Sequence, residues 1–152
     1  MSGNAALPPF VDEHATLVAA PPATVWPALL RSVEATTAGG ASGRFAALLG
    51  CADTAATGPR PLATGSAFPG FHVGVADEPS ELELLGSHRF SRYALTFRVD
   101  DLGDGRSRVR AETRAAFPGV KGRVYRALVI GTRMHVLVTN RILAAVRHRA
   151  ER

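Results

Sequence analysis

The last fifth of the chain, residues 119–148, carries one helical pattern that constrains the fold more than any other segment. At 100° per residue its apolar stripe comprises Val120, Val124, Leu128, Gly131, His135, Val138, Ile142 and Val146. Such a stripe must cover an apolar surface. A mid-helix glycine costs about 1 kcal/mol relative to alanine, and a histidine brings two polar nitrogens to a face expected to be dry. The helix therefore either packs unusually closely at Gly131 and His135 or lines a cavity there.

Two strictly alternating runs supply the surface that this helix would cover. The first places Tyr93, Leu95, Phe97 and Val99 on one face, and the second does the same with Val109, Ala111, Thr113, Ala115 and Phe117. A predicted turn over residues 100–105, which contains a Gly-Asp-Gly sequence, joins them. The opposite face of this predicted hairpin carries Arg92, Arg98, Arg108, Arg110 and Arg114, with Glu112 among them. One apolar face and one arginine-bearing face call for a single covering layer.

The first half of the chain predicts shorter elements. Residues 12–19 alternate like a strand, and a helix with Val25, Trp26 and Leu29 at helical spacing follows to about Glu34. A glycine-rich break precedes a second short helix near residues 45–49, and residues 51–65 form a connecting loop with room for one strand. Alternation at residues 71–75 and 82–84 then predicts two further strands.

Residues 20–29 read APPATVWPAL, small residues and prolines around a Val-Trp pair between a strand and a helix. This segment, with the long final helix, resembles the START-like superfamily, also called SRPBCC or birch-pollen-allergen-like. The resemblance implies an α+β helix-grip fold, with a curved antiparallel sheet wrapped around a long C-terminal helix and two short helices after the first strand. One departure is the strand number, because we predict five or six strands where the family usually has seven.

Composition limits the remaining possibilities. With 152 residues, we expect a flexible N-terminus over residues 1–10 and one domain over residues 11–152. The single cysteine, Cys51, excludes an internal disulfide and cysteine-pair zinc motifs, and we expect no metal or other cofactor. No stretch is apolar enough to span a bilayer and no secretory signal is evident, so we expect a cytoplasmic monomer or homodimer.

The resemblance further implies a cavity between the sheet and the final helix that holds an apolar or amphipathic small molecule. Members of the superfamily include lipid carriers, hormone-binding proteins, polyketide aromatases and cyclases, and chaperone-associated modules. The residues expected to line such a cavity are Trp26, Phe71, Tyr93, Leu95, Phe97, Phe117, Val124, Leu128, Gly131 and His135. Fold alone does not choose among these functions.

Three histidine and tyrosine side chains are candidates for chemistry. His135 would offer a ligand one hydrogen bond, or else be a core histidine bonded to the sheet. His88 and Tyr93 would both point inward and act as an acid and base pair on a carbonyl compound, or else belong to a solvated hairpin bend.

Two basic features concern anions. Lys121 and Arg123 lie where the final helix begins, which suggests either a carboxylate or phosphate site or simply solvated charge. The formal charge of +5 and the arginine face allow phosphate binding. We do not expect nucleic-acid binding, because that face lacks exposed aromatic residues for base stacking.

Three functions follow. A noncatalytic binder of a hydrophobic or amphipathic molecule, such as a lipid or polyketide, needs a cavity. A cyclase, aromatase or dehydratase needs at least two of His88, Tyr93 and His135 in one pocket. An interaction module using the arginine face would have a fully packed interface between helix and sheet.

Overall fold

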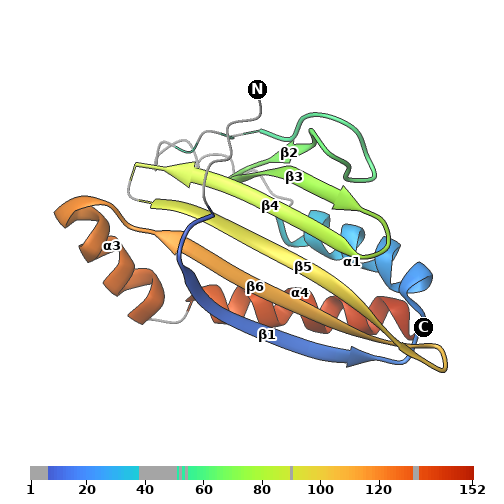
Figure 1. The fold of residues 1–152 in the computed structure, drawn as a ribbon. Coiled ribbons are helices and arrows are strands. Elements are labelled where there is room, and N and C mark those ends of the chain that lie inside the picture. The colour runs from blue at the N-terminus through green and yellow to red at the C-terminus, as the bar shows by residue number, and fades with distance from the viewer. Residues whose placement is uncertain (1–6, 38–50, 52, 54, 90, 132–133) are drawn as a thin grey trace.

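The computed structural model describes residues 7–37, 51, 53, 55–89, 91–131 and 134–152, and it contains one curved sheet with two helices covering one side and a third helix beyond its end (Figure 1). The strands are β1 (Phe10–Val18), β2 (Ala67–Phe68), β3 (Phe71–Asp77), β4 (Glu81–His88), β5 (Ser91–Gly103) and β6 (Arg106–Ala116). The helices are α1 (Pro22–Thr37), α3 (Gly119–Gly131) and α4 (Met134–Ala150). All strand pairs are antiparallel, in the order β1-β6-β5-β4-β3-β2. The predicted α+β class is confirmed.

Helices α1 and α4 pack against each other and cover the inner face of the sheet (Figure 1). Helix α1 begins at Pro22, where the first turn tolerates proline, and it buries Val25, Leu29 and Val33 at helical spacing. Helix α4 buries Ile142, Leu143, Val146 and Ala150. Beneath them lie the fully buried sheet residues Leu82, Leu84, Phe97, Val109 and Ala111. One hydrophobic core therefore joins both helices to the middle of the sheet.

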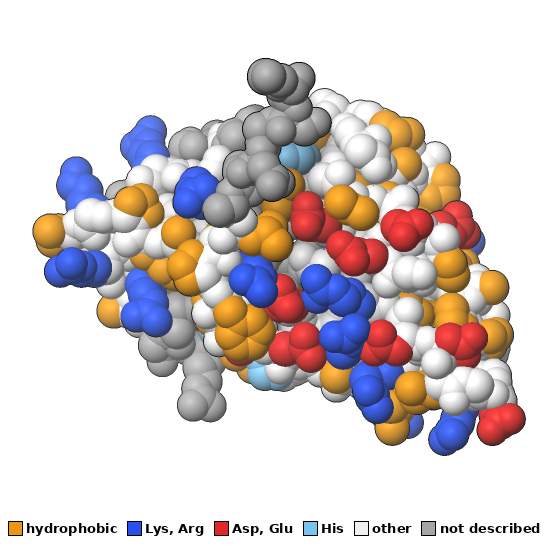
Figure 2. Space-filling model, viewed as in Figure 1, with side chains coloured by type: hydrophobic (Ala, Val, Ile, Leu, Met, Phe, Trp, Pro, Cys, Tyr) orange, Lys and Arg blue, Asp and Glu red, His pale blue; other side chains and the backbone are white. Residues whose placement is uncertain are grey.

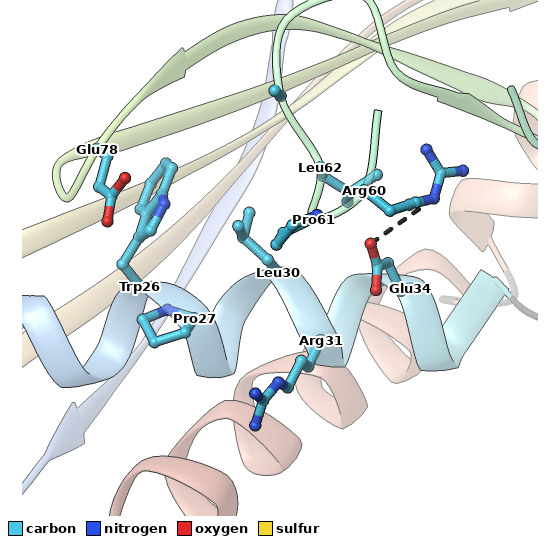
Figure 3. A pocket seen from close by; sticks show the side chains of 10 residues that line it. Trp26, Pro27, Leu30, Arg31, Glu34, Arg60, Pro61, Leu62 and Glu78 are labelled. Atoms are coloured by element: carbon cyan, nitrogen blue, oxygen red, sulfur yellow. Dashed lines mark ion pairs between the residues drawn. The ribbon is translucent and has the colours of Figure 1, made fainter. Parts of the chain in front are cut away.

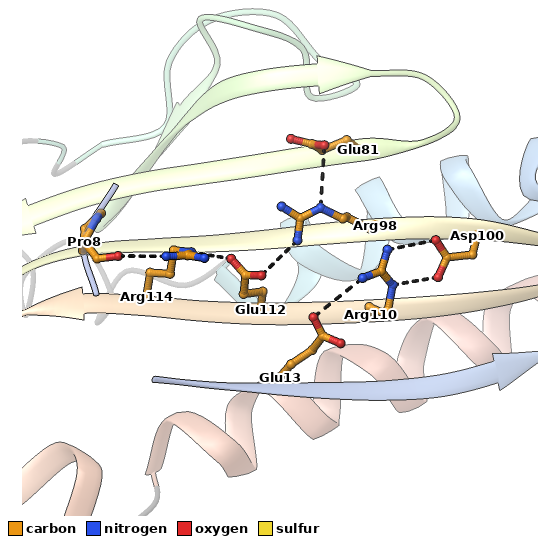
Figure 4. A network of polar contacts seen from close by, with 8 residues as sticks. All are labelled: Pro8, Glu13, Glu81, Arg98, Asp100, Arg110, Glu112 and Arg114. Carbon is orange, nitrogen blue, oxygen red and sulfur yellow. Dashed lines mark hydrogen bonds and ion pairs between the residues drawn. The ribbon is translucent and has the colours of Figure 1, made fainter. Parts of the chain in front are cut away.

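The outer face of the sheet carries the predicted arginines, and carboxylates compensate several of them (Figure 4). Arg110 donates two hydrogen bonds to Asp100, at 2.7 and 3.0 Å. Glu112 accepts from Arg114 and, at 3.2 Å, from Arg98. The hydrogen bond from Arg110 is the main cause that holds the pKa of Asp100 below its usual range. This face is therefore an ion-pair network across neighbouring strands, which does not favour phosphate binding.

The C-terminal helical segment differs from the prediction of one continuous helix, since α3 ends at Gly131 and α4 begins at Met134. Gly131 is thus a helix-terminal residue and not a mid-helix one. Three members of the predicted apolar stripe, Val120, Val124 and Val138, are exposed. The prediction that they face the sheet is wrong. It treated the segment as one helix, and two separate helices can turn different faces toward the sheet.

Other boundaries agree or shift modestly. The first helix extends to Thr37, beyond the predicted Glu34. The second short helix predicted near residues 45–49 lies outside the described residues. In the described part of residues 51–65 there is an isolated bridge between Thr57 and Ala67 and no strand. No helix among the described residues is long and apolar enough to cross a membrane.

Candidate functional site

The inner face of the sheet has two halves with different coverage. Strand register places Phe97 beside Leu82 and Ala111, and all three are fully buried beneath α1 and α4. Further along the same face, Leu95 and Tyr93 on β5 are only half-buried, as is Phe71 on β3. Because partial burial leaves ring and methyl surface within reach of a small molecule, the second half is the candidate functional site.

Five rings form a continuous series across this half, which we call the aromatic row: Phe71, Tyr93, His88, Tyr125 and Phe117. Successive ring centroids are separated by 5.0, 5.6, 4.7 and 6.2 Å, distances typical of aromatic contacts. The row starts on β3, crosses β5 and β4, and reaches α3 before it ends at Phe117, just beyond the end of β6. It therefore connects the sheet to the helix that projects from its end (Figure 1).

Tyr93 is held in place by two glycines. Gly86 is its cross-strand partner, and a Cβ atom at Gly86 would lie 2.2 Å from both the Tyr93 ring and the Gly70 carbonyl oxygen. The Tyr93 hydroxyl donates to that carbonyl at 2.6 Å. Burial, reinforced by the neighbouring Cys51 thiol, raises the pKa of Tyr93 far above its usual range. Tyr93 is consequently a fixed hydrogen-bond donor and a poor general acid.

His88 is the last residue of β4, and its side chain lies between Tyr93 and Tyr125. Its Nε2 atom is 3.1 Å from the Ser91 hydroxyl. Burial lowers the pKa of His88, so the neutral imidazole predominates at neutral pH. The structure thus brings together His88 and Tyr93, whose side chains the strand pattern predicts to point inward together.

His135 lies instead on the β1 side of the inner face, in a cluster with Asp12 and His14. The carboxylate atom Oδ2 of Asp12 is 2.7 Å from His135 Nε2 and 3.3 Å from His14 Nε2. The carboxylate can only accept, so His135 Nε2 carries the hydrogen and donates it. The second atoms of this pair, Asp12 Oδ1 and His135 Nδ1, are buried without a hydrogen-bond partner in the described structure. Asp12, which sequence analysis missed, is therefore the partner that orients His135.

Three predicted lining residues lie elsewhere, and we correct their assignment. Phe97 is fully buried, and it belongs to the core and not to a ligand surface. Val124 is 59% exposed on α3. Trp26 lines a separate pocket of about 560 Å³ between α1, residues 60–63 and Glu78 (Figure 3). An ion pair of 3.7 Å between Arg60 and Glu34 lies at this pocket, which we call the Trp26 pocket.

The remaining candidates have these positions. Phe117 is half-buried in the aromatic row, and Lys121 and Arg123 are exposed on the first turns of α3. The burial of Leu128 and Gly131 lies outside what the structure describes. Burial raises the pKa of the Cys51 thiol, which makes it a weak nucleophile. Among the described residues no cluster of histidine, cysteine and carboxylate side chains fits a metal ion.

The sequence matches no protein-family model and no curated protein. Norcoclaurine synthase from Thalictrum flavum has a similar structure, with a TM-score of 0.59 and 12% identity over 91% of this chain and 93% of that one. Protein CV1439 from Chromobacterium violaceum gives 0.56 and 10% identity over 95% and 99% of the two chains. The chain therefore has the same helix-grip fold as these structures. In this helix-grip fold, α4 is the helix that the sheet wraps around.

A second bacterial helix-grip protein, Ms6760 from Mycobacterium smegmatis, aligns over 92% of this chain and 96% of that one, with a TM-score of 0.54 and 12% identity. At such identities the likeness establishes the fold and no activity.

Proposed function

We propose that the protein binds a small, largely apolar molecule against the aromatic row. The observation that carries this proposal is the uneven coverage of the inner face: Phe97 and Leu82 are fully buried, whereas Tyr93, Leu95 and Phe71 on the same face are half-buried. A ligand that covers this half-buried aromatic surface removes it from water, and this burial makes the free energy of binding more favourable. A related helix-grip structure, norcoclaurine synthase in complex with a transition-state analogue, supports the capacity of the fold to hold a small molecule.

The chemistry around the row favours an amphipathic ligand with one polar end. Phe71, Leu95 and Phe117 offer apolar contacts, while the neutral His88 imidazole and the Ser91 hydroxyl beside it form a polar group at the same surface. The sheet register also places Asp12 beside Thr113, which is the neighbour of Leu95. The polar cluster of Asp12 and His135 therefore borders the apolar surface on its β1 side.

The test is a fluorescence titration with N-phenyl-1-naphthylamine, a neutral probe that brightens in apolar sites. We expect saturable binding that Leu95→Trp weakens by at least roughly tenfold, since an indole would occupy the half-buried surface. The matched control is Ala63→Trp, which adds the same group to the Trp26 pocket. Loss of binding in Ala63→Trp but not in Leu95→Trp would move the site to the Trp26 pocket, and absence of saturable binding would refute the proposal.

A carbonyl-processing enzyme is the second candidate, because a neutral imidazole at His88 next to an aromatic surface suits proton abstraction beside a carbonyl group. The Tyr93 hydroxyl, which donates to Gly70, is then a positioning group and not the acid. In deuterium oxide, we expect the wild-type protein to accelerate exchange of the α-protons of 2-tetralone and His88→Gln to abolish that acceleration. If both proteins exchanged the α-protons no faster than free imidazole does, the enzyme hypothesis would be refuted and only the binding function would remain.

A further inference from the structure

Helix α3 presents an apolar stripe to solvent. Val120 is 76% exposed and Val124 is 59% exposed, and Ala127 on the same face is exposed as well. The opposite side of the helix faces the protein, where Gly122 is buried and the Tyr125 ring contacts His88 at 4.7 Å. The helix is thus fixed by its inner side while two valines point away from the core. Exposed apolar stripes on a helix indicate a binding surface.

Cations flank this stripe. On the helical wheel, Lys121 and Arg123 lie on either side of Val120 and Val124, and Arg126 lies next to Arg123. All three cationic side chains are exposed. Residues 113–150 contain no aspartate or glutamate, so no acidic residue on this segment compensates them. Figure 2 shows basic and hydrophobic side chains interspersed over α3, at the left of the view, with the acidic side chains gathered over the sheet.

The outer face of the sheet provides the contrast within the same molecule. There Arg98, Arg110 and Arg114 all contact carboxylates. Among the ion pairs between described residues, none involves α3. The positive charge on α3 is therefore available to an external anionic surface, and that surface must also accept apolar side chains.

We propose that α3 docks on the surface of an anionic lipid bilayer. Valines at the centre of the stripe would enter the boundary between headgroups and acyl chains, and the long stems of Lys121, Arg123 and Arg126 would let their charges reach lipid phosphates. Each such cation strengthens attachment to an anionic leaflet by roughly fivefold. Helix α3 projects from the end of the sheet (Figure 1), and the exposure of Val120 and Val124 leaves the stripe accessible to a flat surface. This inference is independent of what the aromatic row binds.

The experiment is sedimentation of the full chain with vesicles of pure phosphatidylcholine or of equal parts phosphatidylcholine and phosphatidylglycerol. We expect binding only to the anionic vesicles, and weaker binding as sodium chloride is raised. Lys121→Gln, Arg123→Gln and Arg126→Gln together should lower the partition coefficient on the order of a hundredfold. Val120→Ser with Val124→Ser should lower it roughly tenfold.

Matched controls separate α3 from general charge and hydrophobicity. Arg92→Gln, Arg106→Gln and Arg108→Gln remove three exposed cations from the sheet, and Leu17→Ser removes an apolar side chain that is 59% exposed on β1. These variants should bind vesicles like the wild type apart from a small uniform loss. Because every substituted side chain is exposed, unchanged circular dichroism should accompany all variants.

Depth of insertion gives a direct readout of the docked face. The fluorescence of Val124→Trp should be quenched by lipids brominated on their acyl chains, whereas that of Leu17→Trp should not. Absence of binding to anionic vesicles, binding that the α3 variants leave intact, or α3-dependent binding to polyglutamate without binding to vesicles would each overturn the proposal. The last result would identify an acidic protein surface as the partner.

Discussion

Helices α3 and α4 follow one another in the chain and carry a similar apolar periodicity, yet they have opposite relations to the rest of the protein. Helix α4 buries Ile142 and Val146 against α1 and the sheet, and Glu151, just beyond its end, accepts a hydrogen bond from the Ala19 amide at 2.8 Å. Helix α3 turns Val120 and Val124 to solvent. Periodicity therefore shows that a helix has an apolar face, but the tertiary structure decides what that face meets.

The inner face of the sheet shows the same contrast between buried and partly exposed apolar residues. A matched pair of substitutions tests this contrast, and it has the largest expected effect on stability. Phe97→Ala should destabilise the protein by about 3–5 kcal/mol because Phe97 is fully buried between the helices and the sheet. Phe117→Ala in the aromatic row should cost only about 1 kcal/mol, since its ring is half-buried. Urea denaturation measures both. Equal losses would show that the aromatic half is a closed core.

The second test concerns the close approach of Tyr93 to the backbone. Gly86→Ala would place a Cβ atom 2.2 Å from the Tyr93 ring and the Gly70 carbonyl oxygen, so we expect a loss of about 2–3 kcal/mol from overpacking. The control, Gly105→Ala, has open space around it but a φ of +70°, and should cost about 1 kcal/mol. A smaller loss for Gly86→Ala than for Gly105→Ala in thermal denaturation would contradict the geometry of Tyr93.

Much of the sheet was predictable because its signals are local. The alternation around Phe97 and Val109 predicts β5 and β6, but β5 continues to Gly103, through the first part of the expected turn over residues 100–105. The division of the C-terminal helix was not recognised, although Gly131 carries a signal for it. Glycine is common where helices end, and here it is the last residue of α3. The apolar pattern continues on both sides of Gly131, and this continuity favoured one uninterrupted helix.

The candidate site was only partly predictable because it depends on contacts between distant segments. Strand register alone brings His88 and Tyr93 together, and that pairing was expected from their strands. Asp12 and His135 are 123 residues apart, so no spacing rule links them. Tyr125 was missed because the wheel places it off the stripe that was assumed to face inward. Its burial follows from the separate orientation of α3.

A third prediction examines how α4 is attached to β1. Asp12→Ala removes the acceptor shared by His135 and His14, and we expect a loss of about 2 kcal/mol, typical of hydrogen bonds to a charged group. Amide hydrogen exchange should show faster opening at the start of α4, near His135, than at Val146. The control, Asp101→Ala, removes an exposed carboxylate near the end of β5 and should leave α4 unchanged. Uniform acceleration along α4 would contradict a local attachment.

The smallest expected effect is on how the free energy of unfolding depends on pH. This dependence should differ between the aromatic half of the inner face and the outer face of the sheet. Burial lowers the pKa of His88 in the folded protein, so the unfolded chain binds the proton more tightly. This contribution to stability is complete above about pH 6.5 and is lost as pH falls through the lower folded pKa. Because the imidazole is partly solvated, the loss should be less than about 1 kcal/mol.

Urea unfolding of the wild type and His88→Gln between neutral and mildly acidic pH isolates this contribution. The free energy of unfolding should depend less steeply on pH in the variant than in the wild type. The lowered pKa of Asp100 acts in a different window: its stabilisation, which comes mainly from the Arg110 hydrogen bond, is present above about pH 4 and lost only below it. Asp100→Asn should therefore leave the His88 window untouched. If instead Asp100→Asn flattened the slope near pH 6 and His88→Gln did not, the acid sensitivity would belong to the ion-pair network and the aromatic row would be solvated like an ordinary surface.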